Sequence, residues 1–145
     1  SYYVNSDIYN SLPSELKNGI INTTVVSGHG STSGETHFTS IDKLYLLSTH
    51  EVWEDADGNT SDGINRYDTA YNNTRQLDYY SSQNVTTSSD AGAIKKNNGS
   101  EYSWWLRTAY SGSDNIFYNE YYSGKLVSNY SANNSHCVSP AFRIG

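Results

Sequence analysis

The sequence is short of the residues that stabilise many small domains. It contains a single cysteine, Cys137, and no methionine, and hydrophobic residues fill only 35% of its 145 positions. One cysteine excludes an intramolecular disulfide and the cysteine-rich kinds of zinc site. No apolar run is long enough for a transmembrane helix, so we expect no membrane insertion.

Basic residues are few as well. Nine lysines and arginines stand against 15 acidic residues, which gives a net charge of −6. Binding to nucleic acid or to an anionic membrane surface requires a cluster of basic side chains. The basic residues here are scattered, and Lys95-Lys96 is the only adjacent pair. We therefore expect no nucleic-acid partner.

Tyrosine is the residue that the chain has in abundance. The 14 tyrosines dominate an aromatic fraction of 14%, so a single domain over residues 1–145 must build much of its core from aromatic side chains. A buried tyrosine hydroxyl needs a hydrogen-bond partner, and we expect some tyrosines to lie at the surface. The abundance of Ser, Thr, Asn and Tyr, with little Lys and Glu, favours an extracellular, cell-surface or virion-surface protein.

Local patterns in the first third predict strands around one short helix. Residues 1–10 have the spacing of an extended segment. Pro13 suits the first turn of a helix, and Gly19 is a natural end for it. Residues 20–27 are predicted as a strand, and the Gly/Ser/Thr-rich residues 29–39 as a loop or hairpin.

The middle of the chain predicts one buried strand followed by two helices. Residues 43–47 form the most hydrophobic run and are short enough for a buried strand. Ser48 and Glu51 match a capping box, which predicts a short helix through Trp53. The spacing of apolar residues predicts a further helix over residues 68–80.

Two strands are predicted in the last third. Residues 103–108 form a core strand in which Trp104 and Trp105 point to opposite faces, because adjacent strand residues alternate. Residues 138–144 have the alternating side-chain pattern of a strand and are predicted as the terminal strand. Strands interleaved with short helices, without strict strand–helix alternation, indicate the α+β class.

Four segments carry a resemblance to a known group of proteins: Asp-Lys-Leu-Tyr-Leu-Leu-Ser at 42–48, Tyr-Asn-Asn-Thr-Arg at 71–75, Trp-Trp-Leu-Arg-Thr at 104–108 and Val-Ser-Pro-Ala-Phe-Arg at 138–143. In this order they resemble bacterial and phage surface domains related to the formylglycine-generating-enzyme type of C-type-lectin fold. The resemblance covers about residues 10–145. It implies a C-type-lectin-like fold with short helices packed around a small, mostly antiparallel sheet.

Some members of that wider group are variable proteins of diversity-generating retroelements, which display residues of adenine-rich codons as a ligand-binding surface. Residues 110–136 are similar to such a segment. An Asn codon altered only at its adenines can encode Tyr, Ser, Asp or His but not Lys or Glu, so Glu120 and Lys125 would be fixed framework positions. The residues that fit, and that the resemblance implies as ligand-binding, are Asn115, Tyr118, Asn119, Tyr121, Tyr122, Asn129, Tyr130, Asn133, Asn134 and His136.

The same segment predicts binding on physical grounds. Tyrosine offers a large contact area while freezing two torsions, and Ser and Asn offer adaptable hydrogen bonds, a mixture that antibody paratopes use. We therefore predict a binding module for a protein or glycan receptor. One alternative is that most of these tyrosines complete the core. Another is a structural or oligomerisation module of a larger surface protein, forming a homo-oligomer.

The sequence does not match the catalytic and metal-binding motifs that it partly resembles. The catalytic relatives in this fold use copper-binding cysteines, and only Cys137 is present. Residues 55–59 begin like a calcium loop, but Thr60 stands where Gly is needed and Arg66 where Glu is needed. The four histidines lack metal-ligand spacing, and no nucleophile-elbow motif occurs. We expect no enzyme activity, no metal site and no cofactor.

Overall fold

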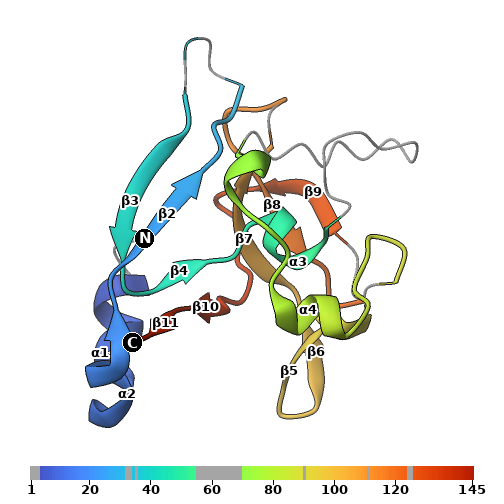
Figure 1. Cartoon of the computed structure of the whole chain (residues 1–145). Coiled ribbons are helices and arrows are strands. Elements are labelled where there is room, and N and C mark those ends of the chain that lie inside the picture. Colours follow the sequence, from blue (N-terminus) through green and yellow to red (C-terminus); the bar gives the residue numbers. More distant parts are fainter. Residues whose placement is uncertain are drawn as a thin grey trace.

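The computed structural model describes residues 4–31, 34, 36–54, 70–89, 91–110, 112–123 and 126–145, with the side chains of residues 4, 5 and 126–129 left out. Within this part the chain forms a few short helices and several small antiparallel sheets (Figure 1). The predicted α+β class is confirmed at this level. None of the described helices is long and apolar enough to cross a membrane.

The N-terminal segment is helical. A π-type turn η1 (Val4–Ile8) leads into α1 (Tyr9–Ser11), and α2 (Ser14–Gly19) follows after Pro13. The predicted extended conformation is therefore wrong for residues 4–10, whereas the helix ending at Gly19 is confirmed. The reason for the error is that Ile8, Leu12 and Leu16 recur every four residues and pack together on Ile20 and Leu44, which favours helical turns.

The predicted strand over residues 20–27 is confirmed as two short strands, and the segment predicted as a loop or hairpin, residues 29–39, ends in a further strand that the sequence pattern did not predict. Strand β2 (Thr23–Ser27) pairs antiparallel with β3 (Phe38–Asp42), with Val25 opposite Ser40 and Ser27 opposite Phe38. Side chains alternate along a strand, so Val25, Ser27 and Phe38 share one face. This face turns towards the second half of the molecule.

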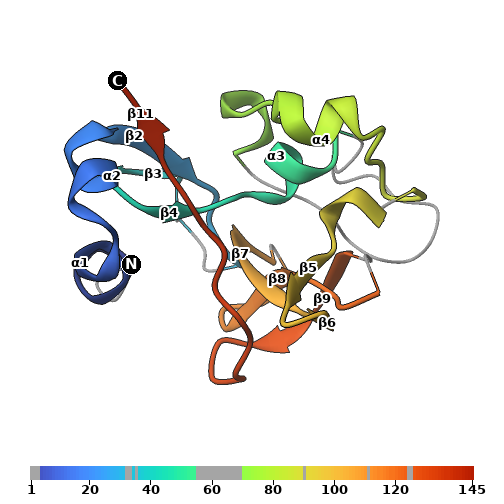
Figure 2. The same ribbon diagram turned by 90° about the horizontal axis from the view of Figure 1, so that it is seen from below.

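The C-terminus returns to the N-terminal half. Strand β4 (Tyr45–Leu46) pairs with β10 (Pro140–Ala141), and β1 (Ile20–Ile21) pairs with β11 (Arg143–Ile144). The predicted terminal strand is thus present as two short pieces. Figures 1 and 2 show the C-terminal segment running from β9 back to the N-terminal helices. The N-terminal helices, the β2–β3 hairpin, β4 and the last two strands thus form a first lobe.

The capping box is present as predicted. The Ser48 hydroxyl accepts from the Glu51 amide at 3.2 Å, and the Glu51 carboxylate accepts from the Ser48 amide at 2.8 Å. Helix α3 (Thr49–Val52) begins after this cap, and Trp53 is its C-cap residue. Both Val52 and Trp53 are fully buried.

The predicted helix over residues 68–80 is wrong in its described part. Residues 70–80 contain a single 3-10 turn, η2 (Tyr71–Asn73), then coil, then the start of α4 (Asp78–Ser82). The break has a tertiary cause, because the Leu77 amide donates to the Glu51 carbonyl. The buried Gln76 amide likewise donates to the carbonyls of Val52 and Val85.

A three-stranded antiparallel sheet, β7–β8–β9, forms the second lobe with α3 and α4. Its strands are β7 (Trp104–Ala109), β8 (Ile116–Glu120) and β9 (Leu126–Ser131). A 3-10 turn, η3 (Ala91–Ala93), leads into a short hairpin, β5 (Lys95–Asn97) and β6 (Ser100–Tyr102), which precedes the sheet. Asn98 and Gly99, with φ of 50° and 82°, form the left-handed turn that suits the twist of a two-residue hairpin loop.

The two neighbouring tryptophans face opposite sides of this sheet, as predicted. Trp104 is fully buried in the main core with Trp53, Leu106 and Tyr118, and its indole donates to the Ala93 carbonyl at 3.3 Å. Trp105 lies on the other face and stays partly exposed. One face of the sheet is therefore buried against the main core, and the other face is partly exposed to solvent.

Candidate functional site

Of the predicted ligand-binding residues whose side chains the structure describes, two are buried. Tyr118 and Asn119 both have 0% of their surface exposed, so the expectation that they face a ligand is wrong. They lie on β8, the middle strand of the sheet, between β7 and β9. Tyr118 belongs to the main core, and Asn119 is covered on the opposite face beside its strand partner Trp105.

The other predicted residues lie at or near the surface wherever their side chains are described. Asn115, Asn133 and Asn134 are exposed, and Tyr122 is 48% exposed. Those that are partly exposed are Tyr121, Tyr130 and His136. Asn129 lies on β9 with its side chain outside the described part of the chain.

Four of the predicted side chains gather with Trp105 into one group. Ring centroids lie 4.1 Å apart for Tyr121 and Tyr122, 4.6 Å for Tyr130 and His136, and 4.8 Å for His136 and Trp105. Hydrogen bonding with Tyr122, then burial and the effect of Tyr130, raises the pKa of the Tyr121 hydroxyl to about 12. Tyr122 and His136 also line one cavity, so the ring pairs adjoin, and we call these five residues the aromatic cluster.

A shallow cavity opens beside the aromatic cluster. Its volume is about 470 Å³, and it is lined by Glu101, Tyr102, Ser103, Tyr122, Ser135, His136 and Cys137. We call it the aromatic groove. Tyr102, on β6, is 43% exposed and lies outside the segment that the sequence singled out. Local sequence contains no signal for it, since the β5–β6 hairpin meets residues 122 and 135–137 only in the fold.

Backbone contacts fix the walls of the aromatic groove. The Tyr122 amide donates to the Ser103 hydroxyl at 3.1 Å. The Cys137 amide donates to the Ser103 carbonyl, and the Trp105 amide to the Cys137 carbonyl, both at 3.0 Å. These bonds tie the segment before β10 to the start of β7. The aromatic side chains are therefore held on a preorganised frame, which lowers the entropy lost on binding.

The aromatic groove carries little net charge. Burial lowers the pKa of His136, so its ring is neutral at pH 7. Glu101, the acidic residue in the lining, pairs with Lys96 at 3.4 Å. Recognition here would therefore depend on ring contacts and hydrogen bonds rather than on ionic attraction.

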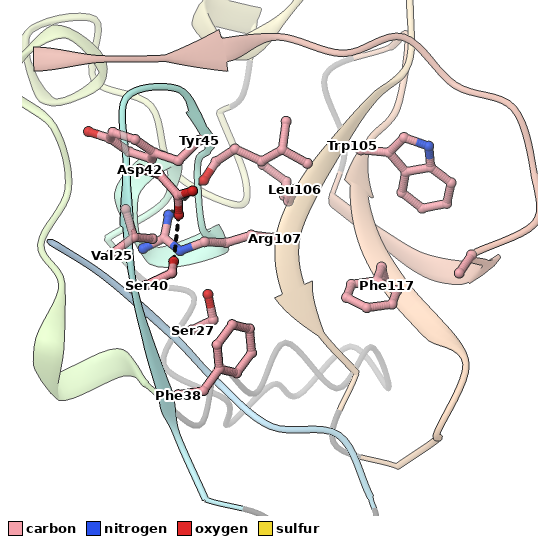
Figure 3. Close-up of a pocket in the computed structure, with 12 residues that line it drawn as sticks. Val25, Ser27, Phe38, Ser40, Asp42, Tyr45, Trp105, Leu106, Arg107 and Phe117 are labelled. Carbon is pink, nitrogen blue, oxygen red and sulfur yellow. Dashed lines mark hydrogen bonds between the residues drawn. The ribbon is translucent and has the colours of Figure 1, made fainter. Parts of the chain in front are cut away.

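A second cavity separates the two lobes (Figure 3). Its volume is about 350 Å³, and it lies between the β2–β3 hairpin and the open face of the sheet. We call it the hairpin groove. Its lining is Val25, Ser27, Phe38, Ser40, Asp42, Tyr45, Leu46, Trp105, Leu106, Arg107, Phe117 and Ala132. Trp105 belongs both to this lining and to the aromatic cluster.

One ion pair joins the floor of the hairpin groove to helix α3. The Arg107 guanidinium pairs with the Glu51 carboxylate, and both side chains are largely buried. Arg107 also donates to the carbonyls of Leu46 at 2.8 Å and Val26 at 3.3 Å. The same Glu51 carboxylate thus caps α3 and neutralises the arginine.

Among the described residues, no three His, Cys, Asp or Glu side chains come together as a metal site would require. His50 contacts the Tyr71 carbonyl and the Thr74 hydroxyl, and its ring stacks on Tyr71 at 3.7 Å. The calcium-like turn at residues 55–59, with Thr60 and Arg66, lies outside the described residues. So does Lys125, whereas Glu120 is fully buried, as fits a framework position.

Comparison with known protein families yields a match over the whole chain. A family model described as "Domain of unknown function (DUF6273)" matches residues 1–145. No curated protein and no solved structure matches the chain.

Proposed function

We propose that this chain, which belongs to the DUF6273 family, is a binding domain that recognises a protein or glycan receptor through its aromatic cluster and aromatic groove. The observation that carries the proposal is the convergence of Tyr121, Tyr122, Tyr130 and His136, which the sequence predicted as ligand-binding, on one partly exposed surface. Aromatic side chains dominate the energetics of interfaces, and Tyr does so at small entropic cost.

The size of this surface is compatible with useful affinity. Covering the exposed parts of Tyr102 and Tyr122 would contribute roughly 1–2 kcal/mol for each ring. The partly exposed Tyr121, Tyr130 and His136 would add smaller contributions. After the entropic cost of association, a dissociation constant on the order of micromolar follows.

We also propose a C-type-lectin-like fold and an extracellular, cell-surface or virion-surface location. Three of the segments that carry the resemblance contact one another: β4 pairs with β10, and Arg107 on β7 donates to the Leu46 carbonyl on β4. Three segments that are far apart in the sequence therefore lie together in the fold, which supports the resemblance. The tyrosine- and amide-rich surface supports a location where it can meet a foreign partner.

Burial refines the proposal that a retroelement diversifies the C-terminal segment. Variation is tolerated at exposed positions, whereas Tyr118 and Asn119 are sealed in the sheet. We therefore expect adenine-specific differences between the coding segment and a neighbouring template copy at the codons of Tyr122, Asn133 and Asn134. Sequencing the flanking DNA tests this expectation, and equal variation at codons 118 and 119 would contradict it.

A labelled domain with matched tyrosine substitutions tests the binding function. Fluorescently labelled protein is applied to arrayed glycans and to intact cells, with and without protease treatment, which separates glycan from protein receptors. Tyr122→Ala is expected to lower binding about tenfold. Tyr79→Ala is the control, because Tyr79 is 60% exposed on α4, outside the aromatic cluster and groove. Equal binding by both variants would refute the proposal.

The alternative, an oligomerisation module, has one observation in its favour. Phe38, Ile41 and Ile144 are 59%, 70% and 65% exposed, and apolar side chains of this size are often covered in oligomers. Light scattering during size-exclusion chromatography separates the two functions. A stable oligomer in which Tyr102 and Tyr122 become protected from solvent would favour the alternative.

A further inference from the structure

Three of the four arginines in the chain line one polar cavity, although they are far apart in the sequence. Arg75 precedes α4, Arg107 lies on β7 and Arg143 lies on β11. The cavity has a volume of about 360 Å³, and we call it the arginine cavity. Its other lining residues, mostly polar, are Thr23, Thr24, Val25, Val26, Tyr45, Glu51, Asn73, Thr74 and Leu77. A chain with a net charge of −6 thus concentrates positive charge at one place.

Two of the three arginines have acidic partners, and the two pairs differ in strength. Arg107 pairs with Glu51, and both side chains are largely buried, so this charge is balanced inside the protein. Arg75 pairs with Asp78 at 2.6 Å, but their side chains are 71% and 87% exposed. An ion pair in contact with water contributes little, because solvent screens it. Arg75 can therefore exchange this partner for an anion in the cavity.

The third arginine supplies the excess charge. Arg143 interacts with the Tyr45 hydroxyl. Burial raises the pKa of Tyr45, so this hydroxyl is neutral at pH 7 and leaves the charge of Arg143 unbalanced. Within the part of the chain that the structure describes, Arg143 forms no ion pair. Three arginines thus stand against two carboxylates, even when Asp78 at the rim is included.

A buried hydroxyl in the lining also lacks a partner. Thr23 is 4% exposed, and its Oγ1 atom has no hydrogen-bond partner among the described residues. A buried polar group without a partner is unfavourable, so a ligand that accepts from this hydroxyl gains a bond that the protein alone does not make. Four consecutive residues of β2, Thr23 to Val26, line the cavity. The described strands leave β2 paired with β3 alone, and an open sheet edge can form a concave site for anions.

We propose that the arginine cavity binds a small oxyanion, the carboxylate or phosphate group of a ligand. Arg143 supplies the charge, Arg75 approaches from the rim, and the Thr23 hydroxyl donates to the anion. A guanidinium group binds either kind of oxyanion through two parallel hydrogen bonds. The site shares no lining residue with the aromatic groove, so it is separate from the receptor surface proposed above.

Inorganic phosphate and acetate are the probes that test the proposal. Each is titrated into the ¹⁵N-labelled chain while backbone amide shifts are followed, with sodium chloride at equal ionic strength as the control. We expect saturable shifts at residues 23–26 and 73–75, with a dissociation constant on the order of 1 mM, as suits so small a ligand. Chloride is expected not to saturate. The probe that binds more tightly shows whether the natural ligand carries a phosphate or a carboxylate group.

Substitutions assign the parts of the site. Arg143→Gln is expected to weaken the tighter probe about tenfold, and Arg75→Gln to weaken it several-fold. Thr23→Val keeps the shape of the side chain, removes the hydroxyl and is expected to weaken binding several-fold. Lys96→Gln is the matched control, because it removes one positive charge from an exposed side chain on β5 and should leave the affinity unchanged. The amide spectrum of each variant shows that it is folded.

Three results would overturn the proposal. The first is the absence of saturation by either probe up to about 50 mM, a concentration far above the expected dissociation constant. The second is native affinity in Arg143→Gln, and the third is an equal loss in Arg143→Gln and Lys96→Gln, which would be an effect of overall charge. Tyr122→Ala should bind the anions normally, and Arg143→Gln should bind the receptor normally, so the failure of one proposal leaves the other intact.

Discussion

Tyr118 and Tyr122 stand four residues apart and have opposite environments, so their substitution tests the orientation of the C-terminal segment. Tyr118 has 0% of its surface exposed and packs in the core with Trp104 and Leu106, while Tyr122 is 48% exposed. Replacing a buried aromatic residue with alanine costs about 3–5 kcal/mol, because transferred surface is lost and a cavity remains. In a domain of this length each kcal/mol shifts Tm by about 2–4 °C. Tyr118→Ala should therefore lower Tm by about 6–20 °C.

The matched substitution should behave differently. Tyr122→Ala removes a half-exposed ring, and we expect Tm to change by less than about 2 °C. Differential scanning calorimetry of both variants at one pH and protein concentration provides the comparison. A Tyr118 variant as stable as the native chain would contradict the burial of Tyr118. A Tyr122 variant with a Tm about ten degrees lower would contradict the exposure of Tyr122.

Three further predictions concern the frame and the groove. Glu51→Gln should lower the free energy of unfolding in urea by about 3 kcal/mol, since it leaves the largely buried Arg107 charge unbalanced, and an effect below about 1 kcal/mol would contradict the ion pair's role. Ser48→Ala should cost about 1 kcal/mol in the same assay through loss of the helix cap, and an unchanged urea midpoint would show that the cap is dispensable. The pKa of His136, measured by NMR, should lie below the usual value of about 6.5, because burial disfavours its charged form. The unfolded chain then binds more protons, so His136 supports stability above pH 6.5 and this support is lost as the pH falls towards its folded pKa.

Short-range features of the fold were predictable from sequence. The capping box of Ser48 and Glu51 depends on neighbours three residues apart, and it forms as expected. The alternation of Trp104 and Trp105 needs only the two-residue period of a strand. Residues 20–27 predict a strand and β2 lies within them, whereas the pairing of β2 with β3 is not predicted by the local pattern.

Errors arose where distant contacts decide the local conformation. The Leu77 amide donates to the Glu51 carbonyl, and this bond replaces the helix that the spacing over residues 68–80 predicted. At the N-terminus the spacing of residues 1–10 predicts an extended segment, whereas Ile8, Leu12 and Leu16 recur every four residues and pack together as helical turns. In both places tertiary packing outweighs local pattern.

The sequence predicts which segment supplies most of the candidate site, but it does not predict which residues of that segment are exposed there. Residues 110–136 supply four of the five residues of the aromatic cluster, and Trp105 is the fifth. Nothing local shows that β8 is the middle strand, which is why Tyr118 and Asn119 are buried. Tyr102 joins the aromatic groove through the β5–β6 hairpin, a contact set by the fold. The hairpin groove is less predictable still, because its lining comes from β2, β3, β4, β7 and β8.

Recognition through the aromatic groove is tested by the dissociation constant of the Tyr102→Ala/Tyr122→Ala double variant, measured against the receptor or glycan that the native chain selects. We expect a loss of roughly 30-fold or more, since each ring contributes about 1–2 kcal/mol, with an unchanged Tm. Native affinity in the double variant would contradict it, because recognition would then lie on another face of the molecule.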